Sequence, residues 1–123
     1  MSTILAVDDD IVSRLVLKAQ LERLGYEVTE AADAPEALEL FDPTRVALVI
    51  SDYEMPSGSG LDLFEQLRAR AGDERPFVLL TGTADEADLG DSRSLLVDAY
   101  LTKPVGTEAL RTVLQRLLEP TTV

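Results

Sequence analysis

Three short apolar runs, each ending at a polar residue, constrain the fold of this chain more than any other feature. They are ILAV (4–7), VALVI (46–50) and FVLL (77–80), which are followed by Asp8, Ser51 and Thr81. Continuous runs of this kind are typical of strands that are buried on both faces of a parallel sheet. Two weaker segments, 27–31 and 99–102, complete a set of five predicted strands.

Helical patterns alternate with these strands. An apolar stripe predicts a first helix from Val12 to about Leu24, and Gly25 is a typical C-terminal stop. Further helices are predicted at 34–41, 61–70, 84–96 and 107–118. Five β-α units in this order predict an α/β fold with a parallel sheet, helices on both faces and right-handed crossovers. We expect one domain over residues 1–119, with a tail or the start of a linker at 120–123.

Composition excludes several classes of function. The 123 residues carry a net charge of −12, which repels phosphate backbones and anionic membranes, so no direct binding to either is expected. The chain has no cysteine and no histidine, which excludes thiolate nucleophiles, imidazole catalysis and metal sites built on these groups. No apolar run approaches the roughly 20 residues of a membrane span, and no basic region of a signal peptide is present. We therefore expect a cytoplasmic protein.

The predicted strand ends gather chemically active side chains. In open parallel sheets, ligands bind outside the carboxyl ends of the strands. Those ends carry Asp8 and Asp9, Asp52, Thr81 and Lys103. Carboxylates this close repel each other unless a cation is present, and oxygen ligands suit Mg²⁺, with Mn²⁺ as a substitute. A carboxylate beside such a cation and an ammonium group can attack a phosphoryl group and form an aspartyl phosphate.

At these residues the chain resembles the receiver domain of two-component response regulators, including the chemotaxis regulators. The stretches that carry the resemblance are ILAVDDD (4–10), VISDYEMPSGSGLDL (49–63), VLLTGTAD (78–85) and AYLTKP (99–104). The resemblance extends over about residues 3–118. It implies a flavodoxin-like, doubly wound sheet of five parallel strands in the order 2-1-3-4-5, with five helices.

The resemblance also implies a role for each residue of the site. Asp52 would be the phosphoacceptor. The ligands of Mg²⁺ would be Asp8, Asp9, Asp52 and the backbone carbonyl of Glu54. Lys103 would pair with the phosphoryl group, and its bond to Pro104 would be cis. Thr81 and Tyr100 would form a switch pair. Such a domain is not an enzyme with a separate substrate, because it catalyses only the phosphorylation and dephosphorylation of its own aspartate.

Partners follow from the same resemblance. Because the chain has no histidine, the phosphohistidine would come from a histidine kinase or a His-containing phosphotransfer protein. Phosphorylation would alter the face made by the fourth helix, the fifth strand and the fifth helix. That face would contact an output protein or an effector domain outside this chain. The sequence is also compatible with a weak homodimer.

Alternative interpretations remain open at this point. A degenerate receiver would act only as a binding module. A phosphohydrolase with an aspartate nucleophile would carry a second Asp two residues later, where this chain has Glu54. A flavin carrier would need a phosphate-binding loop in place of three aspartates. Taken singly, Asp8 to Asp10 could cap a helix, and Tyr100 could be an ordinary strand residue. Mg²⁺-dependent incorporation of phosphate from acetyl phosphate would discriminate among these functions.

One segment departs from the family pattern. Leu96 and Val97 stand where receivers commonly carry a Gly-Ala pair. The preceding helix is acidic and contains Gly90, which predicts a short or irregular helix. Two outcomes are expected for the apolar pair: at least one of them contributes to a partner or dimer surface, or both are buried.

Overall fold

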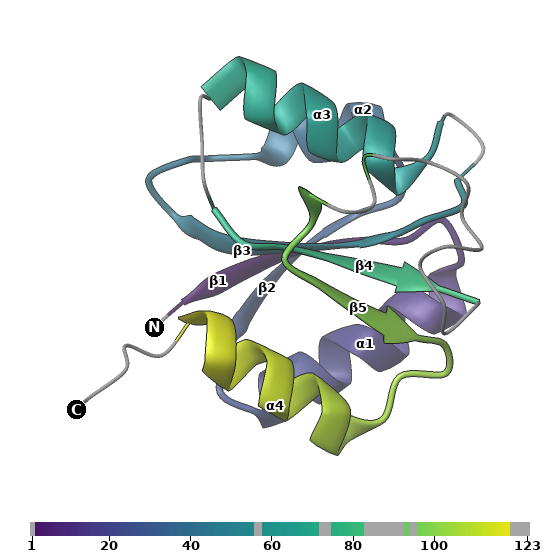
Figure 1. Cartoon of the computed structure of the whole chain (residues 1–123). Coiled ribbons are helices and arrows are strands. Elements are labelled where there is room, and N and C mark those ends of the chain that lie inside the picture. The colour runs from purple at the N-terminus through teal and green to yellow at the C-terminus, as the bar shows by residue number, and fades with distance from the viewer. Residues whose placement is uncertain (1, 56–57, 72–74, 83–92, 94–95, 119–123) are drawn as a thin grey trace.

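The computed structural model describes residues 2–55, 58–71, 75–82, 93 and 96–118. Its centre is a sheet of five parallel strands in the order β2-β1-β3-β4-β5 (Figure 1). The strands are β1 (Thr3–Val7), β2 (Glu27–Ala31), β3 (Val46–Asp52), β4 (Phe77–Thr81) and β5 (Ala99–Thr102). The flavodoxin-like strand order expected from the resemblance is therefore confirmed.

Helices cover both faces of the sheet. The described helices are α1 (Ile11–Arg23), α2 (Ala34–Leu40), α3 (Gly60–Ala71) and α4 (Thr107–Leu118). In Figure 1, α2 and α3 lie on one side of the sheet, and α1 and α4 lie on the other. The predicted helix at 84–96 lies outside the described residues except for Arg93 and Leu96, and so does the predicted tail at 120–123. None of the helices in the described ranges combines the length and the apolar character that crossing a membrane requires.

The core explains why the apolar runs form central strands. Every residue of β1 and β4 is buried, because these strands are covered on both faces. Alternate residues enter two apolar clusters: Leu5 and Leu79 pack toward α2 and α3, and Ile4 and Leu80 pack toward α1 and α4. This alternation is the period-2 geometry of a strand. Because all the strand pairs are parallel, the carboxyl ends of the five strands lie at one edge of the sheet.

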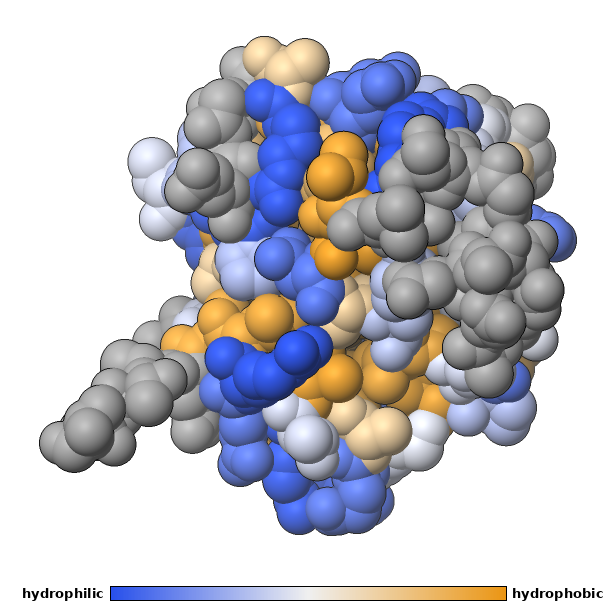
Figure 2. Space-filling model, in the orientation of Figure 1, coloured by the Kyte–Doolittle hydropathy of each residue, from blue (hydrophilic) through white to orange (hydrophobic). Residues whose placement is uncertain are grey.

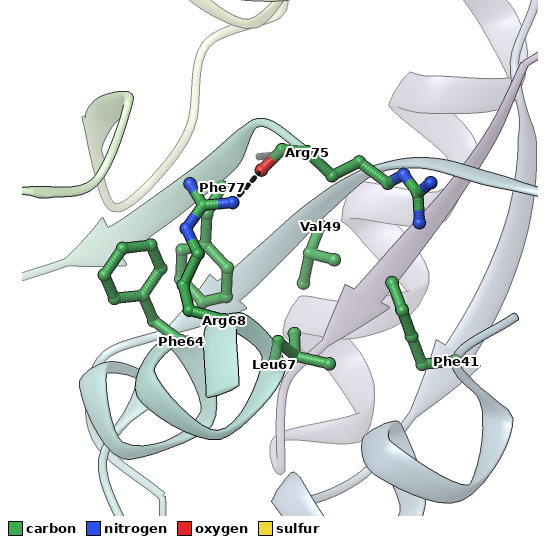
Figure 3. Close-up of a pocket in the computed structure, with 7 residues that line it drawn as sticks. All are labelled: Phe41, Val49, Phe64, Leu67, Arg68, Arg75 and Phe77. Atoms are coloured by element: carbon green, nitrogen blue, oxygen red, sulfur yellow. Dashed lines mark hydrogen bonds between the residues drawn. The ribbon is translucent and has the colours of Figure 1, made fainter. Parts of the chain in front are cut away.

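A small apolar pocket lies at the opposite edge of the sheet, near the amino end of β4 (Figure 3). Its lining residues are Phe41, Val49, Phe64, Leu67, Arg68, Arg75 and Phe77. The guanidinium of Arg68 lies 4.8 Å from the Phe64 ring centre and donates to the carbonyl of Arg75 at 2.9 Å. The guanidinium of Arg75 lies 5.5 Å from the Phe41 ring centre. The two arginine side chains thus flank the core at the amino end of β4, away from the strand ends that carry Asp8, Asp9 and Asp52.

Leu96 and Val97, the apolar pair that departs from the family pattern, differ in their exposure to solvent. Leu96 is 66% exposed, whereas Val97 is 9% exposed and belongs to the cluster beneath α2 and α3. Exposure of Leu96 leaves it available as a contact residue. The alternative, that both side chains are buried, is wrong for Leu96 and correct for Val97.

Candidate functional site

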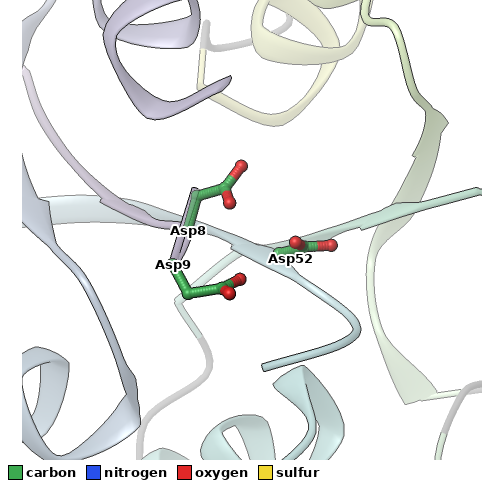
Figure 4. A group of neighbouring side chains, drawn as sticks. All are labelled: Asp8, Asp9 and Asp52. Atoms are coloured by element: carbon green, nitrogen blue, oxygen red, sulfur yellow. The ribbon is translucent and has the colours of Figure 1, made fainter. Parts of the chain in front are cut away.

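Three carboxylates converge at the carboxyl ends of the two central strands. Asp8 and Asp9 follow β1, and Asp52 is the last residue of β3. Val7 and Ser51 are paired in register, so the next residues of both strands emerge side by side. One carboxylate oxygen from each of the three lies within 4.8 Å of the others, and Figure 4 shows the three side chains turned toward a common space. The sheet order reverses at this point, which is the expected ligand position in such a fold.

Lys103 joins two of these carboxylates. Its Nζ donates to Asp8 Oδ2 at 2.9 Å and to Asp52 Oδ2 at 3.0 Å. The lysine follows β5, two strands away from β3, and its backbone N–H donates to the carbonyl of Thr81 at 2.8 Å. The peptide bond between Lys103 and Pro104 is cis. The ammonium group is thus brought to the carboxylates by the loop after β5.

Asp8 is fully buried and remains ionised through its hydrogen bonds. Burial alone would raise its pKa, but donors from Lys103, Ser13 and the backbone of Asp10 outweigh this effect and lower the pKa of Asp8 below its usual value. Ser13 Oγ donates to Oδ2 at 2.7 Å, and the Asp10 N–H donates to Oδ1 at 3.0 Å. Both oxygens of Asp8 therefore already accept hydrogen bonds from the protein.

The surroundings of Asp52 raise its pKa, in contrast to those of Asp8. Burial raises its pKa, the Lys103 ammonium opposes that change, and the negative charges of Asp8 and Asp9 add to it, so the pKa of Asp52 is raised overall. For Lys103, burial would lower the pKa, but the two carboxylates that it contacts raise it above the ordinary value. The site consequently holds more negative charge than one lysine neutralises, and a further cation would stabilise it.

The chain's donor set fits a hard divalent cation. Three carboxylates lie within reach of one another, and the sequence contains no histidine or cysteine that would favour a softer metal. Asp9 is exposed and Asp52 is half-buried, so solvent, and with it a hydrated cation, can reach both side chains. The Glu54 side chain is also exposed. A metal-binding role for its backbone carbonyl stays a prediction.

Thr81 and Tyr100 lie on the same face of the sheet. Thr81 ends β4 and is 2% exposed, and Tyr100 pairs with Leu79, two residues earlier on that strand. The ring of Tyr100 packs against the cluster beneath α2 and α3, and its hydroxyl oxygen is buried. The two residues that the resemblance implies as a switch pair thus lie on neighbouring strands and on one face of the sheet, and their coupling stays a prediction.

Hydrogen bonds to main-chain carbonyls fix the end of β3 around Asp52. Ser51 Oγ donates to the carbonyl of Asp52 at 3.0 Å, and the N–H of Gly60 donates to the carbonyl of Tyr53 at 2.8 Å. A side chain at Gly60 would overlap the Asp52 carbonyl oxygen, and its Cβ would lie 2.8 Å from Leu79 Cδ1. Glycine is thus required where α3 begins, so that the helix can approach the end of the strand.

Sequence reasoning missed three residues that support the site. They are Ser13 and Arg14 on α1 and Ser51 on β3. Ser13 and Arg14 follow Asp8 by five and six positions, which corresponds to the first turn of the helix after the strand. Helical spacing could have brought them to notice, but it could not have shown which of their atoms reach Asp8.

The chain belongs to the response regulator receiver domain family. The family model matches residues 4–115. Among curated relatives, the response regulator MprA of Mycolicibacterium vanbaalenii is 37% identical over 119 residues, covering 97% of this chain and 51% of the relative. The aerobic respiration control protein ArcA of Escherichia coli is 36% identical, covering 96% of this chain and 49% of the relative. The chain thus spans about half the length of these curated relatives.

Solved structures show the same similarity. The chemotaxis protein CheY4 of Vibrio cholerae is 33% identical with a TM-score of 0.86, covering 96% of this chain and 99% of that chain. The response regulator TrrA of Thermotoga maritima, in complex with Mg²⁺-BeF, is 35% identical with a TM-score of 0.85, covering 96% of this chain and 100% of that chain.

A receiver domain is a phosphoacceptor switch of two-component signalling and not a classical enzyme. The family match argues against the flavin carrier and the phosphohydrolase.

Proposed function

We propose that this receiver accepts a phosphoryl group on Asp52 from a phosphohistidine of a partner protein. The observation that carries the proposal is the contact of Asp52 with Lys103 inside a cluster of three carboxylates. In the reaction, a carboxylate oxygen of Asp52 forms a bond to phosphorus while the bond between phosphorus and the partner's imidazole nitrogen breaks. The imidazole leaves with the electron pair of the broken bond.

Each neighbouring group has a part in that transfer. Lys103 places its positive charge beside the acceptor oxygen and the incoming phosphoryl group. Asp9, Asp52, the Glu54 carbonyl and, through water, Asp8 would hold Mg²⁺. The cation, when bound, neutralises charge on the phosphoryl oxygens. Thr81 would donate its hydroxyl to one of those oxygens.

An apolar face on α1 supports a protein as the phosphodonor. Its residues are each 51–66% exposed: Ile11, Val12, Leu15 and Val16. Beside it runs a groove between α1 and the loop after β5, which is lined by Val12, Val16, Lys103, Pro104 and Val105 among others. Because Lys103 contacts Asp52, a histidine-bearing protein seated on this face would lie next to the acceptor.

The output surface is proposed to include β5 and α4. Figure 2 shows apolar side chains gathered where these two elements meet, between polar ones. Val105, Val113 and Leu117 are partly buried against the cluster beneath α1 and α4. Lys103 connects this region to the acceptor, since it directly follows β5. We place the receiver at residues 1–119, acting in the cytoplasm on an output protein or effector domain.

The test of the proposed function is phosphorylation by acetyl phosphate, which replaces the unidentified partner. Intact-protein mass spectrometry should show one phosphoryl adduct in the presence of Mg²⁺ and a large loss of that adduct in EDTA. The adduct should be released by hydroxylamine, as an acyl phosphate is. A wild-type protein without the adduct, or with an equal amount in EDTA, would contradict the proposal.

Replacing Thr81 with alanine should separate phosphorylation from its structural response. The acyl phosphate should still form, because Asp52 and Lys103 are unchanged. The loss of the hydroxyl should remove the link from the phosphoryl oxygens to β4 and its neighbour β5. Hydrogen exchange of β5 and α4, measured before and after acetyl phosphate treatment, should change in the wild type and change much less in Thr81→Ala. Equal changes in both proteins would show that the hydroxyl does not transmit the signal.

A further inference from the structure

We propose that Arg14 is a positioning residue of the metal site, which orients Asp9 through the peptide bond that joins Asp8 to Asp9. This inference rests on the proposed function, since it takes Asp9 as a residue that binds Mg²⁺. Arg14 lies outside the four sequence stretches that carry the family resemblance. It belongs to the first turn of α1, and its side chain is only 15% exposed.

The guanidinium of Arg14 connects three elements. Its Nη1 donates to the main-chain carbonyl of Asp8 at 2.7 Å, and its Nε donates to Glu30 Oε1 on β2 at 3.2 Å. The backbone N–H of Asp8 also donates to the carbonyl of Ala31 on β2 at 3.1 Å. Charge-assisted hydrogen bonds are strong, and the rigid fork of arginine holds two acceptors in a fixed relation. The Asp8 carbonyl is therefore held between α1 and β2.

Both peptide groups that flank Asp9 are fixed by such contacts. The preceding group contains the Asp8 carbonyl, which accepts from Arg14. The following group contains the Asp10 N–H, which donates to Asp8 Oδ1 at 3.0 Å. Since each peptide group is planar, fixing both planes also fixes the direction in which the Asp9 side chain leaves the main chain. The Cα–Cβ bond of Asp9, which carries its carboxylate to within reach of Asp52, thus owes its direction to Arg14 on one side and to Asp8 on the other.

Lys18 provides a matched control. It lies one turn further along α1, and its Nζ pairs with the other oxygen of the same Glu30 at 3.3 Å. Replacing either Arg14 or Lys18 with methionine removes one positive charge close to Glu30, but only Arg14 contacts Asp8. The loss of a nearby positive charge should by itself favour Mg²⁺ binding. Weaker binding in Arg14→Met is therefore opposite in sign to the electrostatic effect.

The experiment is calorimetric titration of Mg²⁺, without any phosphodonor, into the wild type, Arg14→Met and Lys18→Met. Loss of a residue that supports a metal ligand typically costs tenfold or more in metal affinity. We expect Kd for Mg²⁺ to rise about tenfold in Arg14→Met and to stay the same or fall slightly in Lys18→Met. With acetyl phosphate, Arg14→Met should need correspondingly more Mg²⁺ for a half-maximal rate, and its rate at saturating Mg²⁺ should stay close to that of the wild type.

Urea unfolding in EDTA shows whether each variant is folded. If Arg14→Met is unfolded, Arg14→Lys replaces it. The charge is kept, but lysine lacks the planar fork of arginine that holds the Asp8 carbonyl and Glu30 in a fixed relation, so Kd should still rise. Equal Kd values in Arg14→Met and Lys18→Met, tighter binding in Arg14→Met, or a wild-type Kd in Arg14→Lys would overturn the role of Arg14. A wild type that fails to bind Mg²⁺ would instead overturn the proposed function.

Discussion

Asparagine in place of Asp52 should abolish the formation of the acyl phosphate, with a loss of at least about 10³-fold in rate, as is typical when a nucleophile is removed. The amide has nearly the same shape as the carboxylate, but its oxygen is a poor nucleophile. Reaction with acetyl phosphate and Mg²⁺, followed by borohydride trapping and peptide mass spectrometry, should locate the adduct at Asp52 in the wild type. The same treatment of Asp52→Asn should give no adduct.

Asp42→Asn is the matched control for this change. Asp42 lies in the exposed segment before β3, where its carboxylate accepts hydrogen bonds only from the backbone and hydroxyl of Thr44 among its described contacts. The same chemical change at this position should leave the rate of adduct formation at the wild-type level. An adduct of undiminished intensity in Asp52→Asn would show that another residue is the acceptor.

The stability of Asp52→Asn should show that the lost reaction is not caused by unfolding. Because the folded-state pKa of Asp52 is raised above 3.8, ionisation of this group costs stability in the folded protein as pH rises above that value. Without metal, the free energy of unfolding of Asp52→Asn should therefore exceed that of the wild type at neutral pH. The difference should shrink below about pH 4, where the carboxyl group is protonated in both states. Urea titrations at the two pH values in EDTA provide the measurement.

Alanine in place of Gly60 should destabilise the protein by about 1–3 kcal/mol, the usual cost of forcing a group into a filled space. In most helices this substitution is favourable by up to about 1 kcal/mol. The sign is reversed here because the new methyl group would overlap the Asp52 carbonyl oxygen and crowd Leu79. To relieve the overlap, α3 or the end of β3 must move. If the end of β3 moves, the acceptor Asp52 moves with it. Phosphorylation by acetyl phosphate should therefore also slow.

Gly106→Ala is the control for Gly60→Ala. Gly106 precedes α4, and a Cβ built there meets no atom within 4 Å. Its effect on the free energy of unfolding should stay within about 1 kcal/mol, as expected for a change at a helix start. Urea unfolding of both variants gives the comparison. Equal stability of Gly60→Ala and the wild type would mean that the contact between α3 and the end of β3 is not tightly packed.

The three carboxylates at the carboxyl ends of β1 and β3 cost stability, and the contacts around them offset part of that cost. The three carboxylates repel each other. Among the described contacts, Lys103 forms ion pairs with two of them, Asp8 and Asp52. Ser13 and the Asp10 N–H stabilise the charge of the buried Asp8. Burial and the remaining negative charge raise the pKa of Asp52, which is the group that the proposed reaction converts into an acyl phosphate.

Local patterns were sufficient to predict the strands and the edge at which the site forms. The apolar runs 4–7, 46–50 and 77–80 form strands because side chains on both faces of a parallel sheet are covered. Parallel strands end at one edge, so the residues that follow them had to meet there. The strand order 2-1-3-4-5 came from resemblance, since periodicity does not say which strands are neighbours.

Tertiary structure alone decided the features that depend on distances between remote residues. These are the burial of Asp8, the contact of Lys103 with both Asp8 and Asp52, the hydrogen bond from Arg14 to the Asp8 carbonyl and the close packing of Gly60. Exposure of Leu96 beside buried Val97 belongs to the same group. An apolar pattern extends over a few neighbouring residues and indicates only which face of a helix or strand is buried. Hydrogen bonds and pKa values change over a few ångströms, and those separations are set only when all the elements pack together.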